Sequence, residues 1–282
     1  MSLPSYVDLT KRLQELFSIG YNFGKVAIST QNSASEAVEF NANGSQDIED
    51  SSVTSDLLVK FNHLCSCVYK WSSNNNVSKE VTFQDILTPG LKLGGVFQYN
   101  LDSQVKNWNA QGQYKLANCT LDCSIDGEGE SSSLFLNGSI VAGLRGFVTG
   151  CECKFDTGEG KMIASSLTCG YLDPGASYLL VRVDSRGLIT GSYFQQVTPC
   201  LELGVVSMPN SEDGPKMDIA TKFALSPQVL TLRGKVNNRS ELGVGCDFQV
   251  VKGMTLSFSS AIDLKTFNSG SHKFGIGLAF AQ

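Results

Sequence analysis

Apolar and polar residues alternate with a period of two over the stretch 236–282. The apolar parity comprises Leu242, Val244, Cys246, Phe248 and Val250, then Met254, Leu256, Phe258, Ile262 and Leu264, and then Phe274, Ile276, Leu278 and Phe280. The other parity carries small and polar side chains, and polar turns at 251–253 and 265–271 interrupt the pattern. Because successive side chains of a strand point to opposite faces, the pattern predicts three strands with one apolar and one polar face. The last strand would be an aggregation-prone edge in an open soluble sheet, and closure into a barrel removes that edge.

Residues 1–24 follow a helical rhythm instead. The apolar positions of this segment are Tyr6, Leu9, Leu13, Leu16 and Phe17. The charged positions between them are Asp8, Lys11, Arg12 and Glu15. This spacing predicts one amphipathic helix, and Gly20 and Gly24 after it predict a flexible joint. The pattern alone fits a surface helix packed on a core equally well.

From Lys25 onward the alternation of period two continues without a second helical segment. It is clear at 91–101, 119–125, 151–155, 179–183 and 217–225. Turn signals rich in Gly and Asn recur about every 10 to 15 residues, with no linker and no break in composition. We therefore predict two parts, an N-terminal helix and joint at 1–24 and a single all-β domain at 25–282.

Three architectures suit many short antiparallel strands: a sandwich, a propeller and a closed barrel. A sandwich of this length would divide into two domains, and a propeller would repeat about every 40 residues. Neither sign is present. A transmembrane β-barrel with a wet lumen accounts best for one face that is steadily polar and one that is steadily apolar.

The composition is typical of β-structure, but it does not by itself indicate a membrane protein. Charged residues make up 17% of the chain, and Gly is frequent at 28 residues. No apolar run approaches the roughly 18 residues of a membrane-spanning helix, and the mean hydropathy is −0.03. Spanning strands give a weak hydropathy signal, so this value does not argue against a barrel. The N-terminus resembles neither a secretory signal nor an Arg-rich presequence, so we expect an internal targeting signal.

The sequence contains no residue pattern typical of a catalytic site or a metal site. The nine cysteines include no CxxC pair, and the two histidines, His63 and His272, are far apart. Zinc sites favour paired cysteines, and a hydrolase needs a clustered nucleophile and base. We predict no enzyme activity, no cofactor and no metal site, with cysteine serving as a small apolar residue.

Four segments in the same order resemble the eukaryotic mitochondrial porins, the voltage-dependent anion channels. They are 6–24, with Tyr6-x-Asp8-Leu9 and the Gly20 and Gly24 joint; 90–93, Gly-Leu-Lys-Leu; 235–238, Lys-Val-Asn-Asn; and 270–280, with its alternating glycines. The resemblance implies a 19-stranded barrel in the mitochondrial outer membrane, closed by pairing of the first and last strands. It also implies a helix inside the pore and a voltage-gated diffusion channel for ions and small metabolites such as adenine nucleotides.

The pore residues implied by the resemblance are charged. They are Lys11, Arg12 and Glu15 on the helix and Lys92, Lys222, Arg233 and Lys273 on the wall. Each lysine can instead be explained as a solubilising charge of the lumen or of a loop. The chain departs from the family pattern at Gln14 and Ile19, where basic residues are usual, and it has a net charge of −5 with acidic clusters at 47–56 and 122–130. We therefore expect weakened anion selectivity or a cation preference, since lumen charge concentrates the counter-ion.

The resemblance implies three further sites. Gly20 and Gly24 would form the hinge of the helix. A nicotinamide-dinucleotide or nucleotide site would comprise Lys11, Leu242, Gly243, Ser259 and Asp263, although Glu241 beside it should repel a pyrophosphate. The signal read by the outer-membrane assembly machinery would comprise Lys273, Gly275, Leu278 and Phe280. At the position where many members carry a membrane-facing glutamate, this chain has Tyr69.

The expected partners are the lipid bilayer, small anionic and cationic metabolites including nucleotides, the outer-membrane assembly machinery and further copies in a homo-oligomer, but no nucleic acid. Two alternatives to a diffusion channel stay open. One is a specialised non-conducting scaffold isoform, and the other is a protein-import pore of the same barrel superfamily.

Overall fold

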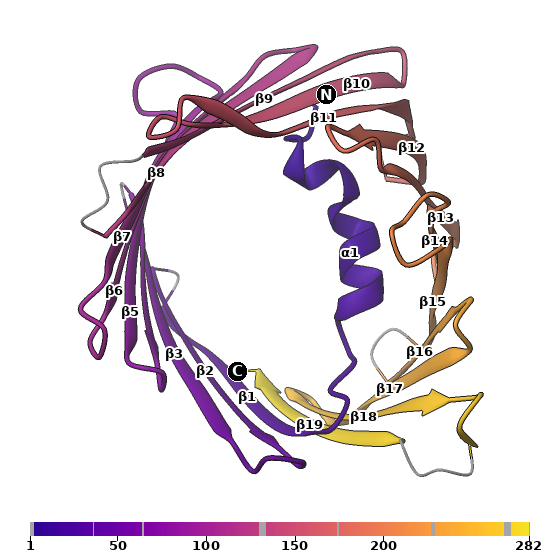
Figure 1. Cartoon of the computed structure of the whole chain (residues 1–282). Helices are drawn as coiled ribbons and strands as arrows, with labels where there is room; N and C mark the ends of the chain where they lie inside the picture. Colours follow the sequence, from indigo (N-terminus) through magenta and orange to yellow (C-terminus); the bar gives the residue numbers. More distant parts are fainter. Residues whose placement is uncertain are drawn as a thin grey trace.

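The computed structural model describes residues 3–35, 37–63, 65–129, 134–173, 175–226, 229–267 and 272–281. Gly270 of the family motif, the end of the predicted turn at 268–271 and residue 130 of the acidic cluster lie outside these ranges. Within them, nineteen strands form one closed sheet, and a short helix stands inside it (Figure 1). The predicted transmembrane barrel with an internal N-terminal helix is confirmed.

The helical segment consists of a 3₁₀ turn, η1 (Val7–Thr10), and the α-helix α1 (Lys11–Ser18). No helix in the described part of the chain is long and apolar enough to span a bilayer, a finding that does not bear on strands. The strands are β1 (Lys25–Ser35), β2 (Val38–Asp47), β3 (Val53–Asn62), β4 (Ser66–Ser72), β5 (Asn76–Gln84), β6 (Leu91–Asn100), β7 (Lys106–Lys115), β8 (Cys119–Glu128), β9 (Leu134–Leu144), β10 (Phe147–Asp156), β11 (Lys161–Asp173), β12 (Ser177–Asp184), β13 (Ile189–Thr198), β14 (Leu201–Met208), β15 (Lys216–Ser226), β16 (Leu230–Asn237), β17 (Glu241–Val251), β18 (Met254–Asp263) and β19 (Lys273–Ala281).

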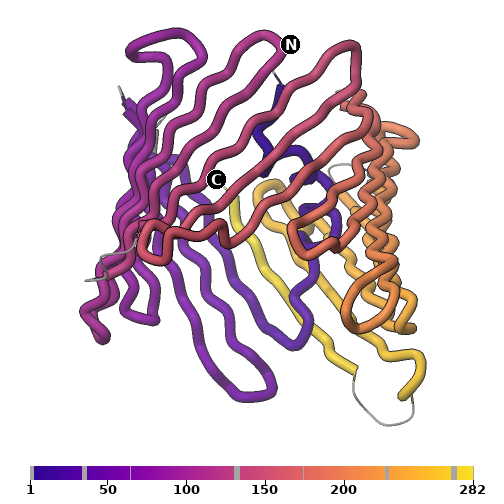
Figure 2. Tube along the Cα trace, turned by 45° about the horizontal axis from the view of Figure 1, so that its top comes forward, coloured from indigo at the N-terminus to yellow at the C-terminus, as the bar shows by residue number. Residues whose placement is uncertain are grey.

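Each strand pairs antiparallel with its sequence neighbours, and β1 closes the barrel against β19. An odd number of strands in an up-and-down order makes the first and last strands run the same way. Accordingly β1 and β19 are parallel, with Val26 opposite Ile276 and Thr30 opposite Phe280. The strands are inclined to the barrel axis (Figure 2), as closure of a sheet requires. None of the nineteen described strands has an unpaired edge, which resolves the aggregation hazard of an apolar terminal strand.

The two faces of the sheet divide as the alternation predicts. Phe274 and Ile276 of β19 are exposed on the outer surface at 65% and 46%, while Gly275 and Gly277 between them are buried inside. Apolar side chains on the outside of a barrel suit contact with lipid. One expectation needs correction, because the lumen face is not steadily polar. Leu180 and Phe194 point inward and are almost completely buried, at 1% and 2% exposure.

Candidate functional site: the lumen and its helix

The inward apolar residues form a patch that carries the helix. One face of the helical segment, with Leu9, Leu13 and Leu16 at 4%, 2% and 4% exposure, packs in one cluster with wall residues of β9 to β15. The wall side of this cluster comprises Val141, Val148, Tyr178, Leu180, Phe194 and Ala220. Burial of each leucine contributes about 2 kcal/mol. The hydrophobic core of this protein is therefore the contact between its helix and one side of its wall.

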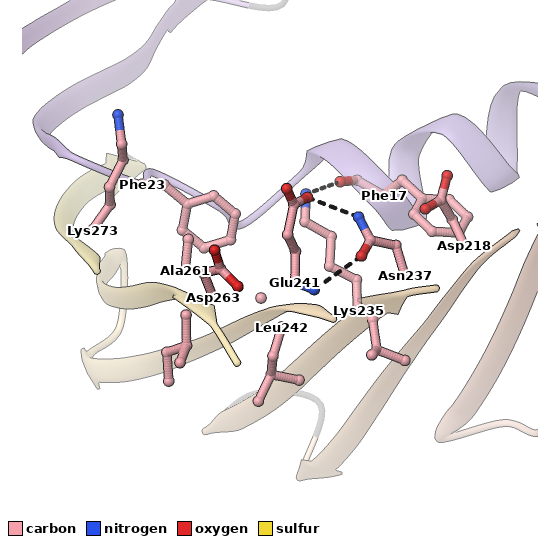
Figure 3. Close-up of a pocket in the computed structure, with 13 residues that line it drawn as sticks. Phe17, Phe23, Asp218, Lys235, Asn237, Glu241, Leu242, Ala261, Asp263 and Lys273 are labelled. Atoms are coloured by element: carbon pink, nitrogen blue, oxygen red, sulfur yellow. Dashed lines mark hydrogen bonds between the residues drawn. The ribbon is translucent and has the colours of Figure 1, made fainter. Parts of the chain in front are cut away.

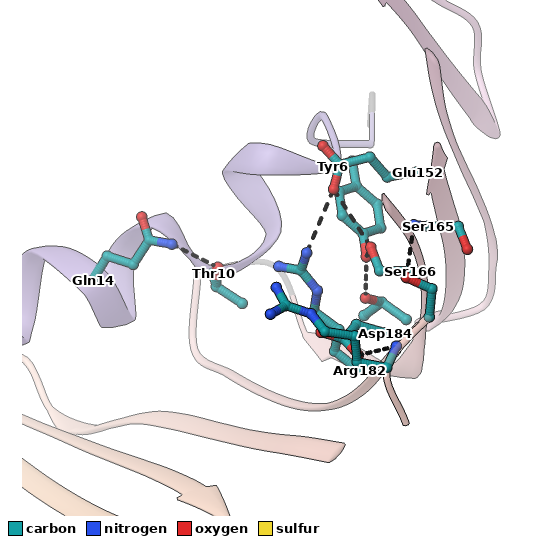
Figure 4. Close-up of polar contacts among 11 residues, drawn as sticks. Tyr6, Thr10, Gln14, Glu152, Ser165, Ser166, Arg182 and Asp184 are labelled. Atoms are coloured by element: carbon teal, nitrogen blue, oxygen red, sulfur yellow. Dashed lines mark hydrogen bonds and ion pairs between the residues drawn. The ribbon is translucent and has the colours of Figure 1, made fainter. Parts of the chain in front are cut away.

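Polar contacts fix the beginning of the segment. The Tyr6 hydroxyl lies 2.7 Å from Ser166 Oγ and 2.8 Å from Thr168 Oγ1, both on β11 (Figure 4). The Arg182 guanidinium lies over the Tyr6 ring, 5.6 Å from its centroid, and pairs with Glu152 at 3.5 Å. Buried hydroxyls that satisfy one another in this way hold one orientation of the chain.

A second anchor lies at the start of α1. The Leu13 backbone N–H donates to the Tyr178 hydroxyl at 3.1 Å, which satisfies a donor in the first turn of the helix. The Tyr178 ring in turn stacks on Phe194, with centroids 5.5 Å apart. The same wall residue therefore provides both an apolar surface and a hydrogen bond for the helix.

The joint after the helix lies tightly against the wall. Gly20 and Gly24 have φ values of +84° and +70°, a conformation that side chains rarely adopt. The Asn22 N–H donates to Ser259 Oγ at 2.9 Å. A Cβ placed on Gly275 would overlap the Asn22 carbonyl oxygen. The structure therefore places the two predicted hinge glycines at the ends of a segment that rests on an inward glycine of the predicted assembly signal.

The predicted wall cations lie in the lumen, and three of the four are paired with carboxylates. Lys222 pairs with Glu202 at 3.3 Å, Arg233 pairs with Asp247, and Lys273 pairs with Glu49 at 3.0 Å. The fourth cation, Lys92, is in no ion pair within the described residues, and it borders a hollow with Asp8, Asp122 and Glu152.

The predicted helix charges differ in their contacts. Lys11 lies 3.9 Å from Asp8 on the same helical segment. Arg12 donates to the Gly175 carbonyl oxygen at 3.0 Å and lies over the Phe194 ring. Glu15 is exposed.

Two wall carboxylates on β8 have neutral partners instead. Gln113 donates to Asp122 at 2.6 Å, with Ser139 at 3.3 Å. Asp126 accepts hydrogen bonds from the side-chain amides of Asn109 and Asn137. Among the described residues no ion pair joins either aspartate to a cation. Their negative charge is therefore held in place but not neutralised.

A cavity of about 570 Å³ lies between the end of α1 and the strands β16 to β18 (Figure 3). Leu242, Gly243 and Asp263 of the predicted nucleotide site line it. Ser259 instead binds the joint, and Lys11 begins α1, whereas the cavity adjoins Phe17 in the last turn. The structure thus brings three of the five predicted residues together.

The charges of this cavity are mixed. Asp218, Glu241 and Asp263 bring three carboxylates to its lining. Lys235 donates to the Phe17 carbonyl oxygen at 2.9 Å, and its ammonium lies 4.2 Å from the centroid of the Tyr21 ring. The ammonium of Lys235 therefore contacts the end of the helix, and Lys273 at the cavity edge is paired with Glu49.

Sequence reasoning missed the residues that carry the helix. Tyr178 and Leu180 occupy the parity that the neighbouring Arg182 and Asp184 mark as polar. An apolar residue at a position of polar parity can be recognised in the sequence. Here it appears as the continuous apolar run 178–181, which interrupts the alternation. The carboxylate partners Glu202 and Asp247 gave no such signal, because pairing across strands depends on the register.

Comparison with known proteins agrees with this architecture. A model of the family "Eukaryotic porin" matches residues 3–275. The chain is 33% identical over 288 residues to the "Voltage-dependent anion-selective channel" of Drosophila melanogaster, and the match covers 99% of each chain. It is 29% identical over 281 residues to the "Non-selective voltage-gated ion channel VDAC1" of Homo sapiens, covering 98% of each.

Solved structures are more distant. A structure titled "Asymmetric conductivity of engineered proteins" has a TM-score of 0.49 and 11% identity, and the match covers 90% of this chain and 94% of that one. The assignment rests on the sequence matches over the whole length. The chain belongs to the eukaryotic porin family, a family of channels and not of enzymes, and it is a protein of the mitochondrial outer membrane.

Proposed function

We propose that the chain forms a voltage-gated channel through which ions and small metabolites, including adenine nucleotides, diffuse across the mitochondrial outer membrane. The names of its relatives, the closed barrel and the helix inside the lumen support this proposal. The helix lies against the β9 to β15 side of the wall and away from β2 to β7 (Figure 1). A lumen of this kind permits passage without a tight binding site.

We further propose that anion selectivity is weak or reversed in favour of cations. The observation that carries this proposal is the difference between the two kinds of wall charge. Lys222, Arg233 and Lys273 each face a carboxylate. Asp122 and Asp126 are bound by amides and a hydroxyl, so their charge is not cancelled.

The physical reason is the range of the field. Two opposite charges about 3 Å apart act as a dipole, whose field fades well within the Debye length of about 10 Å at 0.1 M salt. An unpaired carboxylate attracts cations over that whole length and raises their local concentration. The unpaired carboxylates on this side of the lumen therefore outweigh Lys92, the one predicted wall cation without an ion pair among the described residues, in the selection of ions.

Nucleotides are expected to pass without the binding site that the resemblance implies. Glu241, Asp218 and Asp263 line the cavity at Leu242 and Gly243, and they repel phosphate groups. Lys235 contacts the helix instead of the open cavity. Transport of ATP should therefore be measurable as flux, without saturation at low concentration.

The test is a recording of the purified full-length protein in planar bilayers. Steps of conductance that close at high voltage of either sign support a voltage-gated channel. A correctly folded protein that gives no conductance would instead favour the scaffold alternative. In a KCl gradient the reversal potential should lie near zero or on the potassium side, and strong chloride selectivity would refute the selectivity proposal.

A further inference from the structure

Lys79, in the interior of strand β5, faces the lipid. Val77, Val81 and Phe83 of β5 lie on the outward parity, and Lys79 shares it and is exposed. Lys79 stands opposite Tyr69 of β4 and Phe97 of β6, whose side chains are 41% and 48% exposed on the outer surface.

This position is unusual for the barrel. Among the described strand residues, the other charged side chains on the outward parity, Lys106 and Asp173, occupy the first residue of β7 and the last of β11. Of the charged side chains on this parity in the described strands, Lys79 is the one that lies in the interior of a strand. Charged residues on the lipid face are costly at the middle of the bilayer and much less so near its surfaces. Their presence usually marks a function.

The depth of Lys79 is set by its place in the strand. It is the fourth of nine residues in β5, so it lies about 10 Å along the inclined strand from the end that begins at Asn76. The flexible stem of a lysine lets its ammonium extend toward the nearer membrane surface while the methylenes stay in the apolar layer.

Aromatic side chains mark that surface. Trp71 of β4 and Tyr99 of β6 both stand opposite Val77, one outward position nearer the strand end than Lys79. Trp108 of β7 stands opposite Phe97, and Trp71 and Trp108 are 58% and 41% exposed. Trp and Tyr on the lipid face gather at the level of the lipid headgroups. The ammonium of Lys79 therefore reaches the layer in which phosphate groups lie.

Lys79 has no anionic partner among the described residues. Its ammonium lies 5.3 Å from the centroid of the Tyr69 ring, and no ion pair joins it to a carboxylate of the described residues. Lys70 on the adjacent β4 provides the contrast, because it faces the lumen and pairs with Asp56 at 3.2 Å. An unpaired cation on the lipid face, beside aromatic rings at headgroup depth, has the chemistry to bind a lipid phosphate.

We propose that Lys79 and Tyr69 form an outer-surface site for the phosphate of an anionic phospholipid. The ammonium would bind the phosphate oxygens, the Tyr69 hydroxyl would donate to one of them, and the acyl chains would lie along the apolar surface of Phe83 and Phe97. This site lies outside the lumen, so it does not depend on the proposed selectivity of the channel.

The two tryptophans of the chain allow a direct test, because both flank Lys79. The full-length protein is reconstituted in phosphatidylcholine vesicles that contain an equal mole fraction of either brominated phosphatidylglycerol or brominated phosphatidylcholine. Bromine quenches tryptophan fluorescence at contact. The site predicts about fivefold local enrichment of the anionic lipid, and hence markedly stronger quenching by it, in the wild-type protein.

Matched variants identify the residue. Lys79→Gln should abolish the difference between the two brominated lipids, while Lys79→Arg should retain it. Lys70→Gln, which removes the same charge from the lumen side of the adjacent strand, should behave as the wild-type protein does. Because Lys79 faces outward, the Gln variant should retain its far-ultraviolet circular dichroism and its conductance.

Two outcomes would overturn the proposal. One is equal quenching by the two lipids in the wild-type protein. The other is a lipid preference that is the same in Lys79→Gln as in the wild-type protein. If Lys79→Gln instead reduces cross-linking between copies in pure phosphatidylcholine and the lipid preference is absent, the surface is an interface between proteins.

Discussion

At the scale of single residues, selectivity depends on which charges have a charged partner. Lys222 and Glu202 are 20 positions apart in sequence and meet only because β14 and β15 pair in one register. The sequence alone identified the candidate cations but could not identify the carboxylates with which they pair. A shift of the register by one residue would turn one of them to the lipid.

The pair Lys222–Glu202 gives a first prediction. Glu202→Gln leaves Lys222 without its carboxylate, so the lumen gains an unpaired cation. We expect the ratio of chloride to potassium permeability to rise by about a factor of two, as measured from the reversal potential in a KCl gradient.

The control makes the same change of net charge in a turn outside the strands. Glu212 lies in the turn between β14 and β15, where its side chain is exposed, and no ion pair joins it to a cation of the described residues. Glu212→Gln should leave the permeability ratio unchanged. An equal shift in both variants would mean that the overall charge of the protein, and not the pairing in the lumen, sets selectivity.

At the scale of elements, the sequence predicted the helix but not the patch of the wall against which it packs. The helical spacing of Leu9, Leu13 and Leu16 predicted an amphipathic segment within 1–24, and the structure has it at 7–18. The wall patch that receives it combines residues from several strands. Single strands show this patch only as an occasional apolar residue, such as Phe194, at a polar position.

Docking of the helix is tested by Leu13→Ala. Leu13 is 2% exposed in the middle of the helix–wall contact, so the change should reduce stability by about 2 to 5 kcal/mol. We expect a lower midpoint of thermal unfolding in detergent and closure of the channel at lower voltage. Glu15→Ala alters an exposed side chain of the same helix and should leave the unfolding midpoint unchanged. Equal midpoints for Leu13→Ala and the wild type would show that the helix is not held by this contact.

The glycine joint gives a third prediction. Gly275→Ala would place a methyl group against the Asn22 carbonyl, so the joint must move away from the wall. The variant is refolded in detergent, where the assembly machinery is absent, and then inserted into planar bilayers. Its conductance should show an altered dependence on voltage. Gly44→Ala provides a control, because nothing lies within 4 Å of that position. If refolded Gly275→Ala gates as the wild type does, the glycine would matter for recognition during assembly and not for the joint.

At the scale of the whole molecule, the alternation of period two was sufficient to predict a closed barrel. Its apolar parity at 274–280 lies on the outer surface, and β19 meets β1 as the predicted closure requires. The strand number came from the family resemblance, because turn spacing alone does not fix it. Once the register is known, the parity of each position shows which face of the wall its side chain occupies. Lys79 faces the lipid, whereas its sequence neighbours Ser78 and Glu80 face the lumen.

The central claim is that unpaired carboxylates of β8, facing the lumen, decide which ions this channel prefers. The reversal potential of single channels in a KCl gradient tests it most directly, comparing the wild type with the double variant Asp122→Asn, Asp126→Asn. The amide side chains can keep the hydrogen bonds to Gln113 and Asn109 while removing both charges. We predict a reversal potential near zero or on the potassium side for the wild type and a clear shift toward chloride for the variant. Strong chloride selectivity in the wild type, or identical reversal potentials in the two proteins, would contradict the claim.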